Sequence, residues 1–541
     1  MEQRTIERIE ASKLDGLVVA NTLPLSSAAK QCSKITTIDV SGIIAEAIRR
    51  THNSESISSP PCAPTVTRNL IGGELKISKS RTWIMVSDPA TQKLLTRVPD
   101  STLAEVQNVV SAAESALPAW SELHMSKRTG LLLAFLEIVK ANVSAFEHAL
   151  KLEIGKITHD ADSEIERGLD AIQCACLGMG KLKGEHWTDR STDIFTTRKP
   201  LGVCLSITPF NFPFMIPLWS IPYALAAGNT VILKPSERAP SIAMLLGECA
   251  MEAGIPPGVF NIVHGSSSVV DKLLSQPAIS AVSFVGSETA GERVFEHAKA
   301  TRKRVQAETS GKNHGVVLDD ANKTQTLYAV AGSAFGSSGQ RCMALSVLVC
   351  VGDTKDWIDD LVTIAKSLKV GSGFDSSAAI GPLITAGSKE RVKSIIDLAE
   401  AEGAHIALDG RTCEVQDYPY GNFVGPTIIT QAKTYMQCYQ EEIFGPVLVC
   451  LEVDSLEEAI ELVNENRFGN GCTLFTMSPT HAQTFQRRIN VGQIGINVPV
   501  LAPSGAVGRT TNKDSFLGDG PGGRSPWEFF TQTQTVTSLW R

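Results

Sequence analysis

The chain has 541 residues, about three to four times a typical domain of roughly 150 residues, so it can bury several cores and form a cleft between them. Hydrophobic residues make up 43% and charged residues 20%, which excludes a wholly disordered, fibrous or multi-span membrane protein. The net charge of −7 disfavours a nucleic-acid binder that relies on bulk basicity. The 12 cysteines are too few and too irregularly spaced for a disulfide scaffold or a zinc site, so we expect reduced thiols and no metal. The longest apolar stretch, residues 212–227, holds three prolines and is too short to span a membrane.

The first 65 residues differ from the rest of the chain. They contain no apolar run of signal-peptide length, and their acidic residues disfavour an ordinary mitochondrial transit peptide. Residues 21–64 are rich in Ser and Thr, end in a cluster of prolines and show no strong periodicity. We therefore expect 1–65 to be a poorly ordered N-terminal extension, and we expect a cytoplasmic location.

Local patterns predict a mixture of elements before residue 200. Residues 70–74 (Leu-Ile-Gly-Gly-Glu) have the composition of a hairpin turn, and 83–86 that of a short strand. Residues 103–120 and 127–153 carry apolar residues three and four positions apart, as amphipathic helices do. Residues 187–198 alternate and contain few turn residues, which predicts an exposed ribbon.

From residue 202 onward, short apolar strands alternate with helical segments. The predicted strands cover residues 202–208, 230–234, 259–263 and 281–284, and each is followed by a predicted helix. A second series of the same kind runs from residue 316 to about residue 497. This alternation predicts an α/β fold whose parallel sheets are covered by helices on both faces.

A cysteine follows a turn rich in Gly and Ser, in Phe335-Gly-Ser-Ser-Gly-Gln-Arg-Cys342. If this turn leads into a helix N-terminus, the helix dipole and the neighbouring Arg341 favour the reactive thiolate of Cys342. A second segment, Thr208-Pro-Phe-Asn211-Phe-Pro213, lies at the end of a predicted strand. Asn211 and the backbone N–H of Cys342 are candidate donors to a developing oxyanion. Taken alone, a cysteine in such a segment is more often inert, and an Asn that merely closes a turn explains the second segment at least as well.

Two further segments fit a dinucleotide. Lys234-Pro-Ser-Glu237-Arg238 follows a predicted strand, where Lys and Glu side chains can bond ribose hydroxyls and the carboxylate repels a 2′-phosphate. Gly286-Ser287 lies where a strand meets a helix, which suits a pyrophosphate although the full glycine fingerprint is missing. The carboxylate of Glu237 favours NAD over NADP.

In combination and order, these segments resemble the aldehyde dehydrogenase superfamily from about residue 66 to residue 541, and within it the methylmalonate-semialdehyde branch. Further segments that carry the resemblance are Arg304-Val-Gln306, Lys312-Asn-His314, Gln440-Glu-Glu442-Ile-Phe444-Gly-Pro446, Phe530-Thr-Gln532 and Thr537-Ser-Leu-Trp540. The resemblance implies a Rossmann-like NAD-binding domain, an α/β catalytic domain and a small β oligomerisation arm. The NAD-binding domain would comprise residues 66–186 and 200–309, and the catalytic domain residues 310–500. The oligomerisation arm would comprise residues 187–199 and 501–541.

The resemblance also implies residue roles. Cys342 would attack the aldehyde to form a thiohemiacetal and then a thioester, and Asn211 would meet the oxyanion. The residues implied in NAD binding are Thr208, Phe210, Lys234, Glu237, Arg238, Ser287 and Glu442. Arg167 and Arg341 would bind a substrate carboxylate, for which paired guanidinium groups are well suited. The partners implied are a small aldehyde and a second copy of the chain in a homodimer or homotetramer, with mitochondria as the alternative location.

The sequence departs from that branch in two places. Glu308-Thr-Ser-Gly-Lys312 places a carboxylate at the position of the general base that hydrolytic aldehyde dehydrogenases use and the acylating branch typically lacks. Residues 498–510 have no aromatic residue where relatives carry an aromatic substrate loop. Three readings stay open here: an acylating semialdehyde dehydrogenase with coenzyme A as acceptor, a hydrolytic enzyme with Glu308 as base on a pathway-specific aldehyde, and a non-catalytic NAD-binding scaffold.

Overall fold

The computed structural model describes residues 6, 11–12, 17–20, 32–38, 65–189, 191–499, 510–518 and 525–539. The chain forms two units, 1–65 and 66–541. In the first unit, strands β1 (Leu17–Ala20) and β2 (Ile35–Ile38) pair in parallel, which the sequence analysis did not predict. Most of the expected extension at 1–65 falls outside the described residues.

The second unit contains a large sheet with the strand order β24–β14–β13–β10–β11–β12–β4–β5. Its strands are β4 (Asn69–Ile71), β5 (Glu74–Lys76), β10 (Val203–Ile207), β11 (Thr230–Lys234), β12 (Phe260–Ile262), β13 (Ile279–Val285), β14 (Arg304–Glu308) and β24 (Phe516–Gly518). The central strands β10 to β14 run parallel and are mostly buried, as apolar strands covered on both faces must be. The predicted hairpin at 70–74 is confirmed by β4 and β5.

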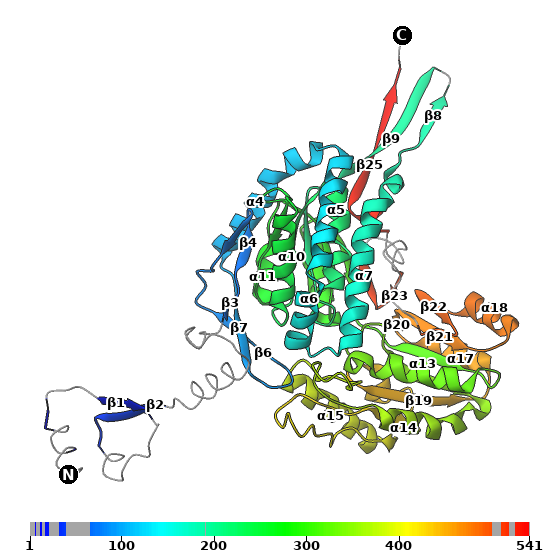
Figure 1. The fold of residues 1–541 in the computed structure, drawn as a ribbon. Helices are drawn as coiled ribbons and strands as arrows, with labels where there is room; N and C mark the ends of the chain where they lie inside the picture. Colours follow the sequence, from blue (N-terminus) through cyan, green and yellow to red (C-terminus); the bar gives the residue numbers. More distant parts are fainter. Residues whose placement is uncertain are drawn as a thin grey trace. The chain divides into compact units, whose positions relative to one another are not determined.

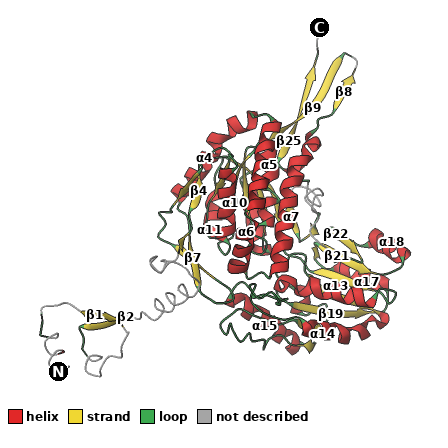
Figure 2. Ribbon diagram, in the orientation of Figure 1, coloured by secondary structure: helices red, strands yellow, loops and turns green. Residues whose placement is uncertain are grey.

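Helices cover both faces of this sheet (Figures 1 and 2). One face packs on α4 (Leu103–Glu122), α11 (Ser267–Leu274) and α12 (Glu288–Ala300). The other packs on α5 (Met125–Ala141), α6 (Val143–Ala149), α7 (Thr158–Leu177), α8 (Met215–Leu218), α9 (Ile221–Ala226) and α10 (Pro240–Glu252). The predicted α/β fold with covered parallel sheets is confirmed.

The single helix predicted over 127–153 is wrong. The segment divides into α5, α6 and the π-helix Leu150–Ile154, and α5 is bent by 64° from the helical stretch that follows. At the break, the Asn142 side chain donates to the Ile138 carbonyl at 2.9 Å, a local bond that competes with continuation of the helix. Apolar periodicity persists across such a break, so it does not reveal the bend.

A second sheet, with the order β17–β18–β19–β16–β15–β21–β22, carries the other half of the unit. Its strands are β15 (Asn313–Val317), β16 (Leu345–Val351), β17 (His405–Leu408), β18 (Thr427–Thr430), β19 (Val447–Val453), β21 (Gly471–Phe475) and β22 (Gln493–Ile496). It is covered by α13 (Lys323–Phe335) and α14 (Ile358–Ser367) on one face and by α15 (Ala386–Ala401), α16 (Gln437–Gln440), α17 (Leu456–Glu465) and α18 (Pro479–Arg488) on the other.

The predicted exposed ribbon is present as β8 (His186–Asp189) and β9 (Thr192–Pro200), which form a three-stranded sheet with β25 (Thr531–Ser538) (Figure 1). The short strands β23 (Asn512–Lys513) and β24 pair with β20 (Phe468–Gly469) and β14 instead. Within the described part of 501–541, only β25 therefore joins this ribbon. The remaining small sheet joins β3 (Thr65–Val66), β6 (Trp83–Ser87) and β7 (Leu94–Pro99).

Among the helices that the structure describes, none by itself is long and apolar enough to cross a membrane. The bent pair Met125–Ala141 and Val143–Ile154 passes that test only when its two halves are taken together, on length and composition.

Asn229 joins three parts of the first half of the unit. Its Oδ1 accepts hydrogen bonds from the backbone N–H groups of Leu201 and Gly202, and its Nδ2 donates to the carbonyls of Ala224 and Phe530, at 2.7–3.0 Å. The residue is fully buried, so its loss would leave four backbone groups without this partner and away from water.

We predict that Asn229→Ala lowers the free energy of unfolding by about 4 kcal/mol, since four bonds are lost and each contributes roughly 1 kcal/mol. Urea denaturation monitored by circular dichroism measures the change. Asn142→Ala is the control, because only one hydrogen bond to a carbonyl is lost there and we expect a loss below about 1 kcal/mol. Equal stability of Asn229→Ala and the wild type would contradict this role.

Candidate active site

Cys342 lies in the loop between α13 and β16, so the thiol does not stand at a helix N-terminus as the sequence analysis expected. Helix α13 ends before the Gly/Ser turn, and a strand follows the cysteine. The turn is left-handed at three successive residues, Ser337, Ser338 and Gly339, with φ of 50°, 57° and 69°. Conformations of this kind at non-glycine residues cost energy and concentrate at functional sites.

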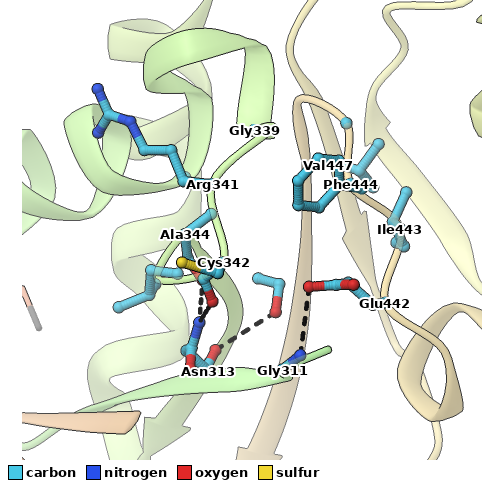
Figure 3. A pocket seen from close by; sticks show the side chains of 14 residues that line it. Gly311, Asn313, Gly339, Arg341, Cys342, Ala344, Glu442, Ile443, Phe444 and Val447 are labelled. Carbon is cyan, nitrogen blue, oxygen red and sulfur yellow. Dashed lines mark hydrogen bonds between the residues drawn. The ribbon is translucent and has the colours of Figure 1, made fainter. Parts of the chain in front are cut away.

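A cavity opens beside Cys342, between this loop and the segment 442–447 (Figure 3). Its lining comprises Gly311, Asn313, Ala334, Gly339, Arg341, Cys342, Ala344, Leu345, Ser346, Glu442, Ile443, Phe444, Gly445 and Val447. We call it the Cys342 cavity. It brings Arg341 and Cys342, which are neighbours in the chain, together with Glu442, which lies far from them in the sequence.

Two amides hold the backbone of Cys342. Asn313 Nδ2 and Asn470 Nδ2 each donate to the Cys342 carbonyl at 2.8 Å, and Asn313 also donates to the Ala344 carbonyl. Both asparagines are buried, and they fix the peptide that carries the thiol. The sequence analysis assigned neither residue a role. Asn313 stands in one of the segments that carry the family resemblance, whereas no local signal marks Asn470.

Asn211 is brought to the cysteine loop as predicted. Its Nδ2 donates to the backbone carbonyl of Gln340 at 3.0 Å, two residues before Cys342. The Asn211 side chain is buried, and its Oδ1 has no hydrogen-bonding partner among the described residues. An amide nitrogen carries two N–H groups, so one of them remains for a reacting oxygen.

One face of α7 connects the Asn211 loop to the Cys342 loop. Asp160 accepts from the backbone N–H of Ser337 at 2.9 Å and forms an ion pair with Arg341. Glu164 accepts from the backbone N–H of Phe214 at 2.9 Å and of Met215 at 3.1 Å, just after Asn211. Both carboxylates are nearly fully buried. Their spacing of four residues on a helix was a signal that the sequence analysis missed.

Glu164 also pairs with Lys156, with 2.5 Å between Oε2 and Nζ. The Lys156 ammonium lies 3.9 Å from the centre of the Phe212 ring. Burial lowers the pKa of Lys156, and the Glu164 carboxylate opposes that shift. A paired charge at this depth is stable only with such compensation, and removing one partner leaves the other uncompensated.

Arg167, on the same face of α7, is the second predicted carboxylate-binding residue. Burial and the positive charge of Arg341 lower its pKa, so the two guanidinium groups lie near enough to repel each other. Arg341 is paired with Asp160. The negative charge of Glu166 partly offsets the repulsion that Arg341 exerts on Arg167. Arg341, through its pair with Asp160, thus lies at the face of α7 that carries Arg167, and the charges of the two arginines interact.

The residues predicted to bind a dinucleotide gather at the carboxyl ends of β10, β11 and β13. Ile207 of β10 is in register with Lys234 of β11 and with Phe284 of β13. Thr208 follows directly, and its buried Oγ1 has no partner within the described part of the chain. Lys234 and Glu237 are paired at 3.6 Å. Burial lowers the pKa of Lys234, while the Glu237 carboxylate opposes the shift.

The other predicted dinucleotide residues border the same region. The Arg238 Nε lies 4.0 Å from Glu237 Oε1. Ser287 occupies the N-cap of α12, and its side chain makes no capping bond. The Phe210 ring packs edge-on against Phe444, with 6.0 Å between their centres.

Glu442 lines the Cys342 cavity opposite the thiol (Figure 3). Its Oε1 accepts from the Gly311 N–H at 3.2 Å, and burial raises the pKa of the carboxyl to about 7 against the lowering effect of Ser310. Lys312 positions this segment, because its Nζ donates to the carbonyls of Cys438 and Glu441 at 2.7 Å. Burial lowers the pKa of Lys312 to about 8.

Glu308, the predicted alternative base, ends strand β14 and is half-buried. It shares its strand face with Gln306, and it is not among the residues that line the Cys342 cavity. Most of the unusual segment 498–510 falls outside the described residues.

A covered parallel sheet with polar residues at its strand ends, facing a cysteine loop on a second sheet, defines the aldehyde dehydrogenase class of oxidoreductases. The chain belongs to the aldehyde dehydrogenase family, whose model matches residues 76–536. No group of three or more His, Cys, Asp or Glu side chains suited to a metal occurs among the described residues.

Several relatives are close in sequence or structure. Over 493 residues the chain is 44% identical to the human methylmalonate-semialdehyde/malonate-semialdehyde dehydrogenase (acylating, mitochondrial), covering 91% of this chain and 92% of the human protein. Over 488 residues it is 46% identical to the Arabidopsis thaliana methylmalonate-semialdehyde dehydrogenase (acylating, mitochondrial), covering 90% of this chain and 80% of the Arabidopsis protein. A Sinorhizobium meliloti protein assigned as a methylmalonate-semialdehyde dehydrogenase, solved with NAD, has a TM-score of 0.86 and 35% sequence identity. The match covers 88% of this chain and 98% of the Sinorhizobium chain.

The N-terminal unit gives a separate match. Residues 1–60 are similar to the phosphoribosyl synthetase-associated domain. The sequence analysis found no family signal in this segment, so this similarity is one that it missed.

Proposed function

We propose that this enzyme oxidises malonate or methylmalonate semialdehyde with NAD and transfers the acyl group from Cys342 to coenzyme A. The observation that carries the proposal is that Arg341 pairs with Asp160 of α7, on the helix face that also carries Arg167, because two guanidinium groups suit a small carboxylate. The names of the relatives, which include acylating semialdehyde dehydrogenases, support it.

The residues at the strand ends fit NAD. The unpartnered, buried Thr208 Oγ1 and the Lys234–Glu237 pair offer polar groups at one sheet edge, and the Glu237 carboxylate disfavours a 2′-phosphate. Lys234, Glu237 and Arg238 would hold the adenosine end, Ser287 the pyrophosphate, and Phe210 and Glu442 the nicotinamide end. Bound NAD supplies the acceptor for the hydride that leaves the substrate.

The chain's own groups carry the remaining chemistry. The Cys342 sulfur, as thiolate, bonds to the aldehyde carbon, and the carbonyl electron pair moves to oxygen, where the Asn211 N–H stabilises it. Loss of hydride restores the carbonyl and leaves a thioester on Cys342. The thiolate of coenzyme A then attacks this thioester, and the Cys342 sulfur leaves as the thiolate. Asn313 and Asn470 hold the peptide that carries this sulfur.

We also propose a homodimer or homotetramer in which the ribbon of β8, β9 and β25 lies against a second copy. Strand β8 is at the edge of this sheet, and Trp187 on it is exposed. An edge strand with an exposed aromatic residue is suited to pairing with another chain.

We propose a mitochondrial rather than a cytoplasmic location, because the relatives that carry a location are mitochondrial.

The choice of acyl acceptor can be tested directly. We predict that the enzyme with malonate semialdehyde and NAD forms about one NADH per active site, and that sustained turnover requires coenzyme A. Absorbance at the NADH band, with and without coenzyme A, measures this. Sustained turnover without coenzyme A that Glu308→Gln abolishes would contradict the proposal and support the hydrolytic reading with Glu308 as base.

Arg167→Gln tests recognition of the carboxylate. A charge-assisted hydrogen bond contributes about 1.5–3 kcal/mol, so we predict that kcat/KM for malonate semialdehyde falls by about 10- to 100-fold. Acetaldehyde, which lacks the carboxylate, is the matched control, and its kcat/KM should change by less than about threefold. Equal losses of kcat/KM for the two aldehydes would show that Arg167 supports the structure of the site without binding the substrate carboxylate.

Glu442 makes the binding of NAD depend on pH. Its pKa of about 7 means that the carboxylate, which accepts hydrogen bonds from ribose hydroxyls better than the neutral acid does, forms only as the pH rises through 7. We predict that the dissociation constant for NAD falls several-fold between pH 6 and pH 8, as measured by calorimetry, on the order of one hydrogen bond to a charged group. Glu442→Gln should bind more weakly and without this dependence. If the dissociation constant for NAD depends on pH equally in Glu442→Gln and the wild type, a group other than Glu442 causes the dependence.

A further inference from the structure

A second, smaller cavity lies behind the Cys342 loop. It is lined by the segment 154–157, Asp160, Asn211, Ser337, Ser338, Gln340 and Gly381-Pro382, and it has space on the order of one water molecule. It is separate from the Cys342 cavity, with which it shares no lining residue. The side chain of Asn211, the proposed oxyanion donor, forms part of its wall.

Nearly every polar side chain of this cavity is already paired. The bonds are Lys156 with Glu164, Asp160 with Arg341 and the Ser337 N–H, Ser338 Oγ with the Gly381 carbonyl, and Gln340 with the Pro382 carbonyl and the Ile384 N–H. Two side-chain atoms remain without a partner among the described residues, Asn211 Oδ1 and Ser337 Oγ. Their residues are only 4% and 8% exposed, so bulk water does not reach them.

Buried polar atoms of this kind are normally satisfied by protein or by ordered water. One atom can only accept a hydrogen bond and the other can donate or accept, which matches the two donors and two acceptors of water. The nearby charges balance, since Lys156 is paired with Glu164 and Asp160 with Arg341. A neutral ligand therefore fits better than an ion.

We propose that one ordered water molecule occupies this cavity, donating a hydrogen bond to Asn211 Oδ1 and bonding to Ser337 Oγ. The water fixes which way the Asn211 amide faces, so that Nδ2 points to the Gln340 carbonyl and to the reacting oxygen. A bond donated to Oδ1 also polarises the amide and makes its N–H groups better donors. Ser337 is thereby a positioning residue for the oxyanion donor, and this role rests on the proposed function.

Ser337→Ala and Ser338→Ala form a matched pair of variants. Both serines are buried and left-handed, with φ of 50° and 57°, so alanine brings a similar backbone cost at each. Ser337→Ala removes one partner of the water, whereas Ser338→Ala removes only the bond to Gly381. We expect the pre-steady-state rate of NADH formation to fall about fivefold in Ser337→Ala, with KM for the aldehyde nearly unchanged, and to stay within about twofold in Ser338→Ala.

A crystal structure at a resolution that shows single water molecules gives a readout that does not depend on activity. We expect a solvent peak within hydrogen-bonding distance of both Asn211 Oδ1 and Ser337 Oγ in the wild type, and a weaker peak or none in Ser337→Ala. Absence of the peak in the wild type, or equal rates of NADH formation in Ser337→Ala and the wild type, would overturn the inference. If no aldehyde supports NADH formation, the proposed function fails, while the solvent peak still decides the water site.

Discussion

Two buried carboxylates on α7 hold the active site together. Asp160 binds the turn before Cys342, and Glu164 binds the backbone just after Asn211, so one helix sets the distance between the proposed nucleophile and the proposed oxyanion donor. Both carboxylates are taken out of water, and each is compensated by a cation, Arg341 for Asp160 and Lys156 for Glu164. Such pairs contribute more to a unique arrangement than to net stability.

The other half of the site follows from the parallel sheets. Strands β10, β11 and β13 are in register, so Thr208, Lys234 and Gly286 reach the same edge although they are separated by up to 78 residues in sequence. In sheets of this type ligands lie at the carboxyl ends of the strands. The second sheet places Glu442 and the cysteine loop on opposite sides of the Cys342 cavity, with Lys312 tethering the Glu442 segment to β15. A dinucleotide bound at the first sheet can thus be contacted by residues of both sheets.

Much of this was accessible from the sequence, because strand–helix alternation and motifs at strand ends are local features. Long-range hydrogen bonds were not accessible, and they decide the details: Asn470 is 128 residues from Cys342 and is marked by no pattern. The expected helix N-terminus at Cys342 was wrong because a Gly/Ser turn precedes a strand as readily as a helix. The helix over 127–153 was wrong because Asn142 ends it without disturbing the apolar period. The similarity of residues 1–60 to another domain was missed because the segment was judged by composition alone.

The charge balance beside the cysteine loop limits what the enzyme can accept. Arg167 and Arg341 bring two positive charges, and Asp160 cancels one of them through its pair with Arg341. Without substrate, one guanidinium charge is partly buried, and the lowered pKa of Arg167 reflects that cost. In the proposed role of Arg167, a substrate with one carboxylate would neutralise this charge, an uncharged aldehyde would leave only the partial offset by Glu166, and a dicarboxylate would overcompensate it. The proposed pair of arginines therefore favours a small aldehyde with a single negative charge over a dicarboxylate.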